Sequence, residues 1–150
     1  MSSNEQAESA LESLIDSLVA AWNVHDAGRF AAVFHEDADF TNVFGMHAQG
    51  REAIERFHAP IFETMFRDSH LSAPETRVRF IRPDVAAVDV RWDMTGARDP
   101  RGDPWPLRRG LMSLVCTREN ADWAIAVMHN MDLPPEELAE AQEDLQRANA

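Results

Sequence analysis

Apolar residues in the first part of the chain recur every three or four positions, which is the spacing of amphipathic helices. Those on one side of the segment 4–25 are Leu11, Leu14, Ile15, Leu18 and Trp22. This pattern predicts a long helix with a polar start. Asp26 has a short carboxylate that accepts bonds from free backbone N–H groups, so it predicts the N-cap of a second, short helix. A third, strongly one-sided helix is predicted over 51–68.

Between the second and third helices the period changes to two, as in a strand. In residues 35–44 the side chains of Phe40 and Asn42 point the same way, which leaves an amide on a side rich in Phe. Four further segments with a strand pattern are 72–84, 85–96, 107–119 and 122–132. Because turn residues separate them, we predict consecutive antiparallel strands. Helices followed by such a meander indicate an α+β domain with a curved sheet wrapped around one or more helices.

Two segments depart from these patterns. Residues 97–106, ARDPRGDPWP, are rich in Pro and Gly and predict an irregular exposed loop, with a cover over a pocket mouth as the alternative. Residues 136–150 are acidic with few large apolar side chains, so we expect a solvated or partly disordered tail. The remaining residues, 1–135, are predicted to form a single domain.

Composition excludes several kinds of partner and chemistry. The net charge of the 150-residue chain is -12, which disfavours nucleic acid and anionic membranes as partners. Cys116 is the single cysteine, and no early apolar run or basic leader is present, so a cytoplasmic location is expected. All basic residues are Arg and there is no Tyr. The chain therefore has no lysine for a Schiff base and no phenol to stabilise an oxyanion.

Trp22 and Asn23 end the first predicted helix, and the motif Phe-x-x-Asp-Ala-x-Phe follows the short helix at 34–40. A glycine turn then leads into the sequence REAI. Together these motifs resemble the nuclear-transport-factor-2-like superfamily, which includes steroid isomerases and SnoaL-like polyketide cyclases. Within it, segments 22–54 and 108–132 are most similar to the bacterial SgcJ/EcaC family.

The resemblance extends over residues 10–134. It implies a cystatin-like α+β barrel, in which a cone-shaped antiparallel or mixed sheet wraps the N-terminal helices around an internal cavity. It also implies an aromatic polyketide or similar secondary metabolite as the ligand, and a homodimer, since dimers are common in the superfamily.

His58 interrupts the aromatic stripe of the third helix and is predicted to face the same interior as Phe57 and Phe62. An imidazole there needs a hydrogen-bond partner, so it is either a satisfied core residue or an acid/base in a pocket. The histidines form no i, i+4 pair and no HExxH motif, so no metal site is predicted. No nucleotide or flavin motif occurs either, and no cofactor is expected.

Asn42 lies where the resemblance to steroid isomerases implies a general-base aspartate. An amide cannot abstract a proton, and Leu18 falls near the place of the oxyanion-donating tyrosine of those enzymes. The steroid isomerase reaction is therefore contradicted twice. Asn42 is predicted either to orient a ligand by hydrogen bonding or to hold a turn.

The last predicted strand carries Asn130 on the same side as Met128. SnoaL-like cyclases have an acid/base aspartate near the end of this strand, and Asp132 is the nearest match. In an apolar cavity its pKa would rise toward neutrality, as proton transfer requires. At an exposed strand end it would have no catalytic role.

Charged and apolar side chains alternate on the strand over 85–96. Asp89, Arg91 and Asp93 share one side, which predicts either a solvated face or a sheet-to-sheet homodimer interface. On the next strand Arg108 and Arg109 point to opposite faces, so only one reaches a pocket, and Arg109 is assigned a structural role.

These observations predict an apolar cavity with sparse polar groups. Its lining is Trp22, Phe40, Phe57, Phe62, Trp92 and Met112, with Asn42, His58 and Asn130 as polar groups. Such a lining suits a flat, mostly apolar ligand with one or two oxygens. If a reaction occurs, we predict cofactor-free proton transfer or cyclisation with His58 or Asp132 as the base, of the SnoaL-like cyclase/isomerase or SgcJ/EcaC type. The alternative is a non-catalytic homodimeric interaction or scaffold protein whose cavity is filled by its own side chains.

Overall fold

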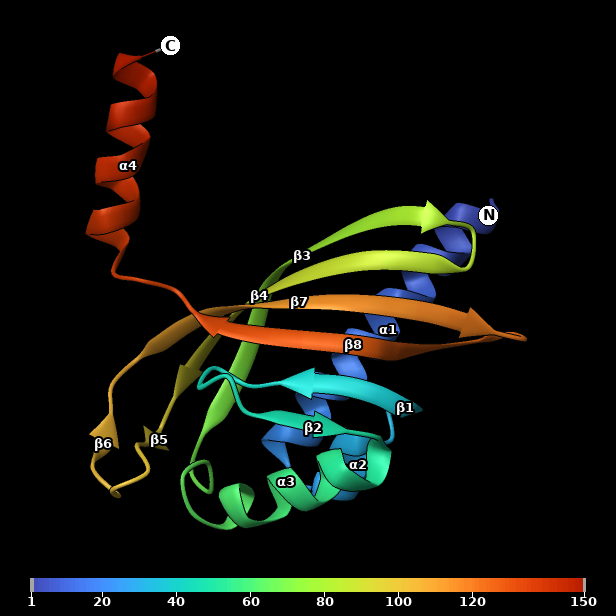
Figure 1. The fold of residues 1–150 in the computed structure, drawn as a ribbon, viewed down its shortest axis with the longest axis horizontal. Helices are drawn as coiled ribbons and strands as arrows, with labels where there is room; N and C mark the ends of the chain where they lie inside the picture. Colours follow the sequence, from blue (N-terminus) through green and yellow to red (C-terminus); the bar gives the residue numbers. More distant parts are fainter. Residues whose placement is uncertain (1, 150) are drawn as a thin grey trace.

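The computed structural model describes residues 2–149, which form four helices and two sheets (Figure 1). The helices are α1 (Ser3–Asn23), α2 (Ala27–Ala31), α3 (Arg51–Glu63) and α4 (Glu136–Ala148). The strands are β1 (Phe34–Thr41), β2 (His47–Gln49), β3 (His70–Arg82), β4 (Val85–Thr95), β5 (Ala97–Arg98), β6 (Pro104–Trp105), β7 (Arg108–Glu119) and β8 (Asp122–Asp132). None of the described helices is both long and apolar enough to cross a bilayer.

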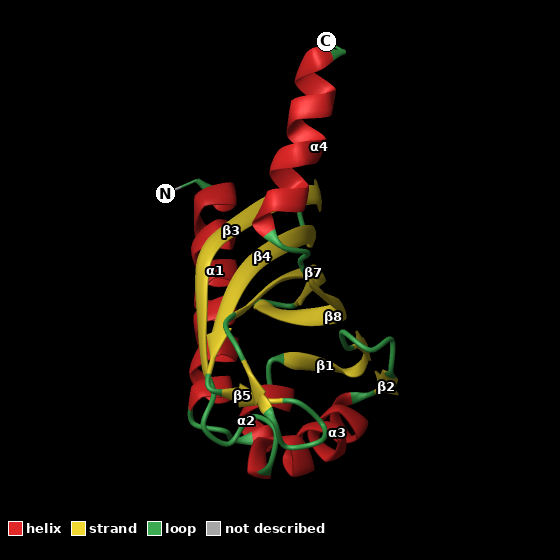
Figure 2. Ribbon diagram, turned by 90° about the vertical axis from the view of Figure 1, so that its left-hand side faces the viewer, coloured by secondary structure: helices red, strands yellow, loops and turns green. Residues whose placement is uncertain are grey.

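Six strands form one mixed sheet in the order β2–β1–β8–β7–β4–β3. All neighbours run antiparallel except β1 and β8, which are parallel. Figure 2 shows the sheet bending over α1, with α2 and α3 beyond its β1 side. The structure therefore confirms the predicted α+β class, with N-terminal helices on the concave side of a curved sheet.

The concave face of the sheet is held against α1 by buried apolar side chains. The buried residues of α1 are Ala7, Leu11, Ile15, Leu18 and Ala21. Alternation on β4 directs Val88, Val90 and Trp92 into the same core, while Asp89 and Arg91 point outward, as predicted. Each large aliphatic side chain buried in this way contributes about 1.5–3 kcal/mol, so this layer fixes the helix across the strands.

The end of α1 is joined to the start of β3 by side-chain hydrogen bonds. The indole Nε1 of Trp22 donates to Ser69 Oγ at 3.0 Å. The amide of Asn23 donates to the carbonyl of Leu71 at 2.9 Å and accepts from its N–H at 2.7 Å. Asp26 then caps α2 by accepting from the N–H of Arg29 at 2.9 Å, which confirms the predicted cap. This junction turns the Trp22 ring toward the interior of the cone.

The prediction of an irregular loop over 97–106 is wrong in part, because the segment folds into a small hairpin of β5 and β6. Asp99 holds its turn by accepting from the backbone N–H groups of Arg101 at 2.8 Å and Asp103 at 3.1 Å. Short polar side chains that satisfy their own turn stabilise a compact loop despite neighbouring Pro and Gly. The hairpin lies beside the open end of the cone.

The acidic segment after Pro135 forms helix α4, and every residue of this helix is exposed, which agrees with the solvated alternative predicted for this tail. Glu136 and Glu137 in its first turn and Arg147 in its last turn match the helix dipole. Figure 1 shows α4 projecting away from the sheet. An ion pair joins its first residue to the sheet, with Arg109 Nη1 2.9 Å from Glu136 Oε1.

Candidate functional site

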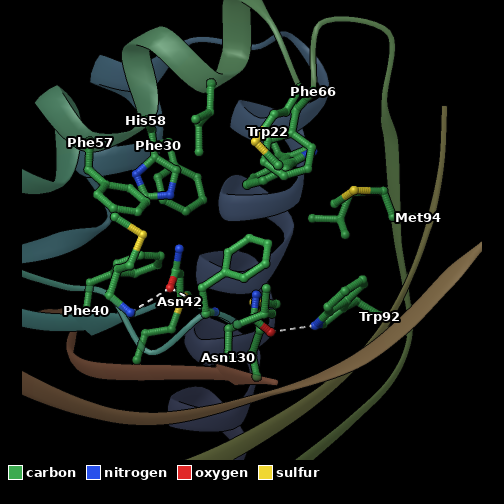
Figure 3. Close-up of a pocket in the computed structure, with 18 of the residues that line it drawn as sticks. Trp22, Phe30, Phe40, Asn42, Phe57, His58, Phe66, Trp92, Met94 and Asn130 are labelled. Atoms are coloured by element: carbon green, nitrogen blue, oxygen red, sulfur yellow. Dashed lines mark hydrogen bonds between the residues drawn. The ribbon is translucent and has the colours of Figure 1, made fainter. Parts of the chain in front are cut away.

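A cavity of about 480 Å³ lies inside the cone, bounded by α1, α3 and the concave face of the sheet (Figure 3). Its wall is mostly aromatic and sulfur-containing. The methionines that line it are Met46, Met65, Met94, Met112 and Met128. Methionine side chains adapt to irregular shapes, and a cavity of this size accommodates a small organic molecule.

His58 is the most deeply placed polar group of the cavity, with 1% of its surface exposed. Its Nδ1 lies 2.7 Å from the carbonyl oxygen of Ile54. A carbonyl only accepts, so Nδ1 carries the hydrogen and Nε2 is the unprotonated acceptor. No fully buried side-chain nitrogen or oxygen among the described residues lacks a partner. Because Nε2 has none, this atom reaches the cavity space.

Aromatic rings surround the imidazole of His58. Its ring centroid lies 4.3 Å from that of Phe30, 4.8 Å from that of Phe40 and 5.2 Å from that of Phe57. Burial among these rings lowers the pKa of His58 to about 4, although the hydrogen bond to Ile54 raises it. The imidazole is therefore neutral at pH 7 and presents a lone pair to the cavity.

Asn42 lines the cavity at the end of β1 and also holds the turn into β2. Its Oδ1 accepts from the backbone N–H of Phe44 at 3.0 Å and from that of Met46 at 2.8 Å. Because the oxygen is used by the turn, its Nδ2 is the group left to face a ligand.

Asn130 is oriented by Trp92 on the sheet wall of the cavity. The indole Nε1 of Trp92 donates to Asn130 Oδ1 at 2.8 Å, as Figure 3 shows. An indole N–H is only a donor, so the contacted atom of Asn130 is its oxygen. The amide nitrogen of Asn130 is consequently a donor, and it has no partner among residues 2–149.

Arg108 forms part of the cavity wall where β7 begins, and its side chain is 5% exposed. Its Nη2 and Nε lie 2.9 Å and 3.3 Å from one oxygen of Asp132, Oδ1. Burial lowers the pKa of the guanidinium, while the charge of Asp132 and its hydrogen bond raise it. Arg108 is thus a buried cation held from one edge by a carboxylate.

The mouth of the cavity is bordered by exposed residues of three segments: Phe44 and Met46 from the β1–β2 turn, Arg56 and Pro60 from α3, and Pro100 from the β5–β6 hairpin. The charged residues of the lining are Arg56 and Arg108, and none of its members is Asp or Glu. The cavity therefore differs from the acidic outer surface in both polarity and sign of charge. Within residues 2–149 no cluster of three or more His, Cys, Asp or Glu side chains is arranged to hold a metal ion.

Residues 15–122 match the SnoaL-like domain family over most of the chain. The protein belongs to this family. No curated protein matches the chain. The SnoaL-like assignment agrees with the helices, curved sheet and internal cavity described above.

Solved structures share this SnoaL-like fold. An uncharacterised protein with a cystatin-like fold from Caulobacter vibrioides is 27% identical with a TM-score of 0.85, covering 94% of this chain and 99% of its own. A proposed scytalone dehydratase from Novosphingobium aromaticivorans is 17% identical with a TM-score of 0.77, covering 88% and 87%. The hexachlorocyclohexane dehydrochlorinase LinA-type3 from Novosphingobium barchaimii is 14% identical with a TM-score of 0.77, covering 89% and 98%. The fold of this SnoaL-like protein is thus cystatin-like.

The SnoaL-like cavity brings together all but two of the residues predicted for it. Those that line it are Trp22, Phe40, Asn42, Phe57, His58, Trp92, Met112 and Asn130. Phe62 does not line the cavity, because its ring packs behind Trp22 with centroids 4.9 Å apart. Asp132 does not line it either. Its side chain is 39% exposed at the end of β8 and turns to Arg108.

Arg108 lines the cavity although the predicted lining did not include it; the sequence indicated only that one of Arg108 and Arg109 could reach a pocket. The alternation on β7 contained the signal, because Arg108 shares the inward parity of Gly110 and Met112. Arg109 points the other way and pairs with Glu136, in keeping with its predicted structural role. A cation was not expected in an apolar lining, since the hydrophobic pattern does not reveal a partner at the end of another strand.

Proposed function

We propose that this SnoaL-like protein binds a small, mostly apolar aromatic or polyketide-like metabolite in its cavity and transfers a proton on it without a cofactor. The observation that carries the proposal is the neutral imidazole of His58, whose Nε2 lone pair reaches an apolar cavity of about 480 Å³. Sparse polar groups in an apolar wall fix the orientation of such a ligand. His58 is the base, and Asp132 is not assigned this role because it lies outside the lining.

The lowered pKa of His58 limits the protons that it can take. A general base is most effective when its pKa lies near the working pH and near the pKa of the group that gives up the proton. Since burial holds the pKa of His58 at about 4, its substrate needs an acidic proton, such as that of a 1,3-dicarbonyl compound, an enol or a phenol. Aromatic polyketides carry such groups, which supports this ligand class.

The names of two structural neighbours describe eliminations, one by a dehydrochlorinase and one by a proposed dehydratase. An elimination of either kind removes a proton from carbon, so both reactions need a base, as proposed here for His58. Their identities of 14–17% support the shared fold only. The motifs in 22–54 and 108–132 support a closer placement within the family, beside SgcJ/EcaC proteins.

Titration with aromatic ketones and aromatic 1,3-diketones, followed by tryptophan fluorescence, tests binding because Trp22 and Trp92 line the cavity. Deuterium exchange at the acidic carbon, followed by NMR, tests proton transfer. His58→Asn retains a donor for the Ile54 carbonyl but removes Nε2, so we expect binding without catalysed exchange. The matched control, His129→Asn, removes an exposed imidazole of β8. Absence of binding across the panel contradicts the proposal, and so does unchanged exchange in His58→Asn.

The alternative of a scaffold with a filled cavity requires side chains in the space that the cavity occupies, and a volume of about 480 Å³ counts against it.

We also propose that the protein forms a homodimer. The outward side of the paired strands β7 and β8 carries Leu111, Val115, Val127 and Met131, with the polar pair Ser113 and His129 between the two apolar pairs. An apolar strip on an uncovered sheet face supports a homodimer formed sheet to sheet.

A further inference from the structure

Arg108 is unlike the other charged residue of the cavity wall. The side chain of Arg56 is 73% exposed, whereas that of Arg108 is 5% exposed. Its guanidinium carbon lies 3.7 Å from the ring centroid of Trp105 and 5.2 Å from that of Trp92. A cation stacked in this way is held in one place, and removing it from water is costly unless its donors find partners.

The hydrogen bonds of Arg108 are satisfied on one edge only. Nε and Nη2 both bond to a single oxygen of Asp132. Nη1 donates to the sulfur of Met94 at 3.8 Å, and a thioether is a weak acceptor. The Nη1 edge therefore lacks an oxygen partner within residues 2–149, although the residue lines the cavity.

The amide nitrogen of Asn130 is a second donor on the same wall. Trp92 links the two groups, since its indole donates to Asn130 Oδ1 and its ring contacts the guanidinium of Arg108. In Figure 3, Trp92 and Asn130 lie on the sheet wall, and His58 lies on the α3 wall. The sheet wall thus presents donors, while His58 presents an acceptor.

We infer that Arg108 is a ligand-binding residue whose Nη1 edge, with the amide of Asn130, binds an anionic oxygen on the ligand. This inference rests on the proposed function and narrows its substrate class to ring compounds with an anionic oxygen. That oxygen belongs either to a carboxylate already present on the substrate or to an enolate that forms during the reaction. An enolate forms when His58 Nε2 takes a proton from the carbon next to a carbonyl: the electron pair of the C–H bond forms a C=C bond, and the π pair of the C=O bond moves onto the oxygen. Asp132 acts through Arg108 and is a positioning residue.

Two probes of similar shape separate this inference from simple apolar binding. 2-Naphthoate carries the anionic oxygen and 2-methylnaphthalene does not, and calorimetry measures both dissociation constants. For Arg108→Gln we expect naphthoate to bind roughly tenfold more weakly or worse, as a lost charged hydrogen bond implies, with methylnaphthalene nearly unchanged. Arg109→Gln is the matched control, since it removes the same charge from the outward face, and both probes should bind it as they bind the wild type.

A second variant leaves Arg108 in place. Asp132→Asn retains an acceptor oxygen that can position the Nε and Nη2 edge of Arg108 but removes a negative charge near the bound anion, so naphthoate should bind as tightly as to the wild type or more tightly. Equal losses for both probes in Arg108→Gln, or unchanged naphthoate binding in that variant, overturn the inference. Weaker naphthoate binding in Asp132→Asn also counts against it. If methylnaphthalene alone fails to bind the wild type, the apolar-ligand proposal fails, while Arg108-dependent naphthoate binding still supports the anion site.

Discussion

Gly110 lies directly beneath the indole of Trp92 on the neighbouring strand. A Cβ atom at position 110 would be 1.9 Å from Cζ2 of Trp92 and 2.6 Å from the carbonyl oxygen of Met131. Only a residue without a side chain lets the ring lie flat on β7. This close contact aims the indole N–H at Asn130, so one glycine of the sheet determines which atom of Asn130 is left as a donor.

Gly110→Ala should therefore displace Trp92 and break its hydrogen bond to Asn130. We expect a loss of about 1–3 kcal/mol in the free energy of unfolding, as for overpacking in a core, together with weaker ligand binding. Urea denaturation and the probe titrations measure the two effects. Gly28→Ala is the matched control, because its new Cβ would make ordinary contacts, the nearest at 3.4 Å. Equal stability of both variants would mean that Trp92 has room to move.

The buried imidazole of His58 should make stability depend on pH. Its pKa is about 4 when folded and 6.5 in the reference state, so the unfolded chain binds more protons between these values. Stability is full above pH 6.5 and declines as the pH falls from 6.5 to 4. At about 1.4 kcal/mol per pKa unit, the difference between 6.5 and about 4 corresponds to a loss of about 3 kcal/mol.

His58→Asn should flatten this part of the profile, because an amide does not titrate. Urea denaturation of the wild type and of the variant at pH 7, 5.5 and 4.5 gives the comparison, with His129→Asn as the control for an exposed imidazole. Parallel profiles for the wild type and His58→Asn would show that His58 is not buried as a neutral group.

The turn-holding role predicted for Asn42 is tested by a pair of substitutions. Its Oδ1 accepts two backbone N–H groups of the turn, so Asn42→Ala should leave both unpaired and cost about 1–3 kcal/mol. Asn42→Asp retains an acceptor in the same place and should keep most of the stability. Denaturation midpoints test this. If Asn42→Ala unfolds like the wild type, the turn does not depend on the side chain.

The sequence predicts the fold well because local patterns and global packing agree. Alternation on β4 separates Trp92 from Asp89 and Arg91, and the spacing in α1 identifies Leu11, Ile15 and Leu18 as buried. These residues need only the period of their own element to be assigned to a face. The same logic identified His58 and Asn42 as members of the lining.

The parts that sequence reasoning missed depend on contacts between elements distant in the chain. Phe62 shares the apolar side of α3, but the position of Trp22 decides that it packs behind the wall. Arg108 is held in the wall by Asp132, which lies 24 residues later. Periodicity assigns a side chain to one face of its own helix or strand. It does not reveal which charged side chain at the end of a neighbouring strand will pair with it.

A dimer formed through the outer face of the sheet should be broken by a charge on that face. Met131 is 43% exposed and pairs with Leu111 across β7 and β8, so Met131→Glu should leave the monomer folded and lower the mass measured by light scattering from dimer to monomer. Leu138→Glu is the control, because Leu138 is an exposed apolar residue of α4. If Leu138→Glu gives the monomer and Met131→Glu does not, the interface involves α4. A wild-type protein that is monomeric at high concentration would exclude both arrangements.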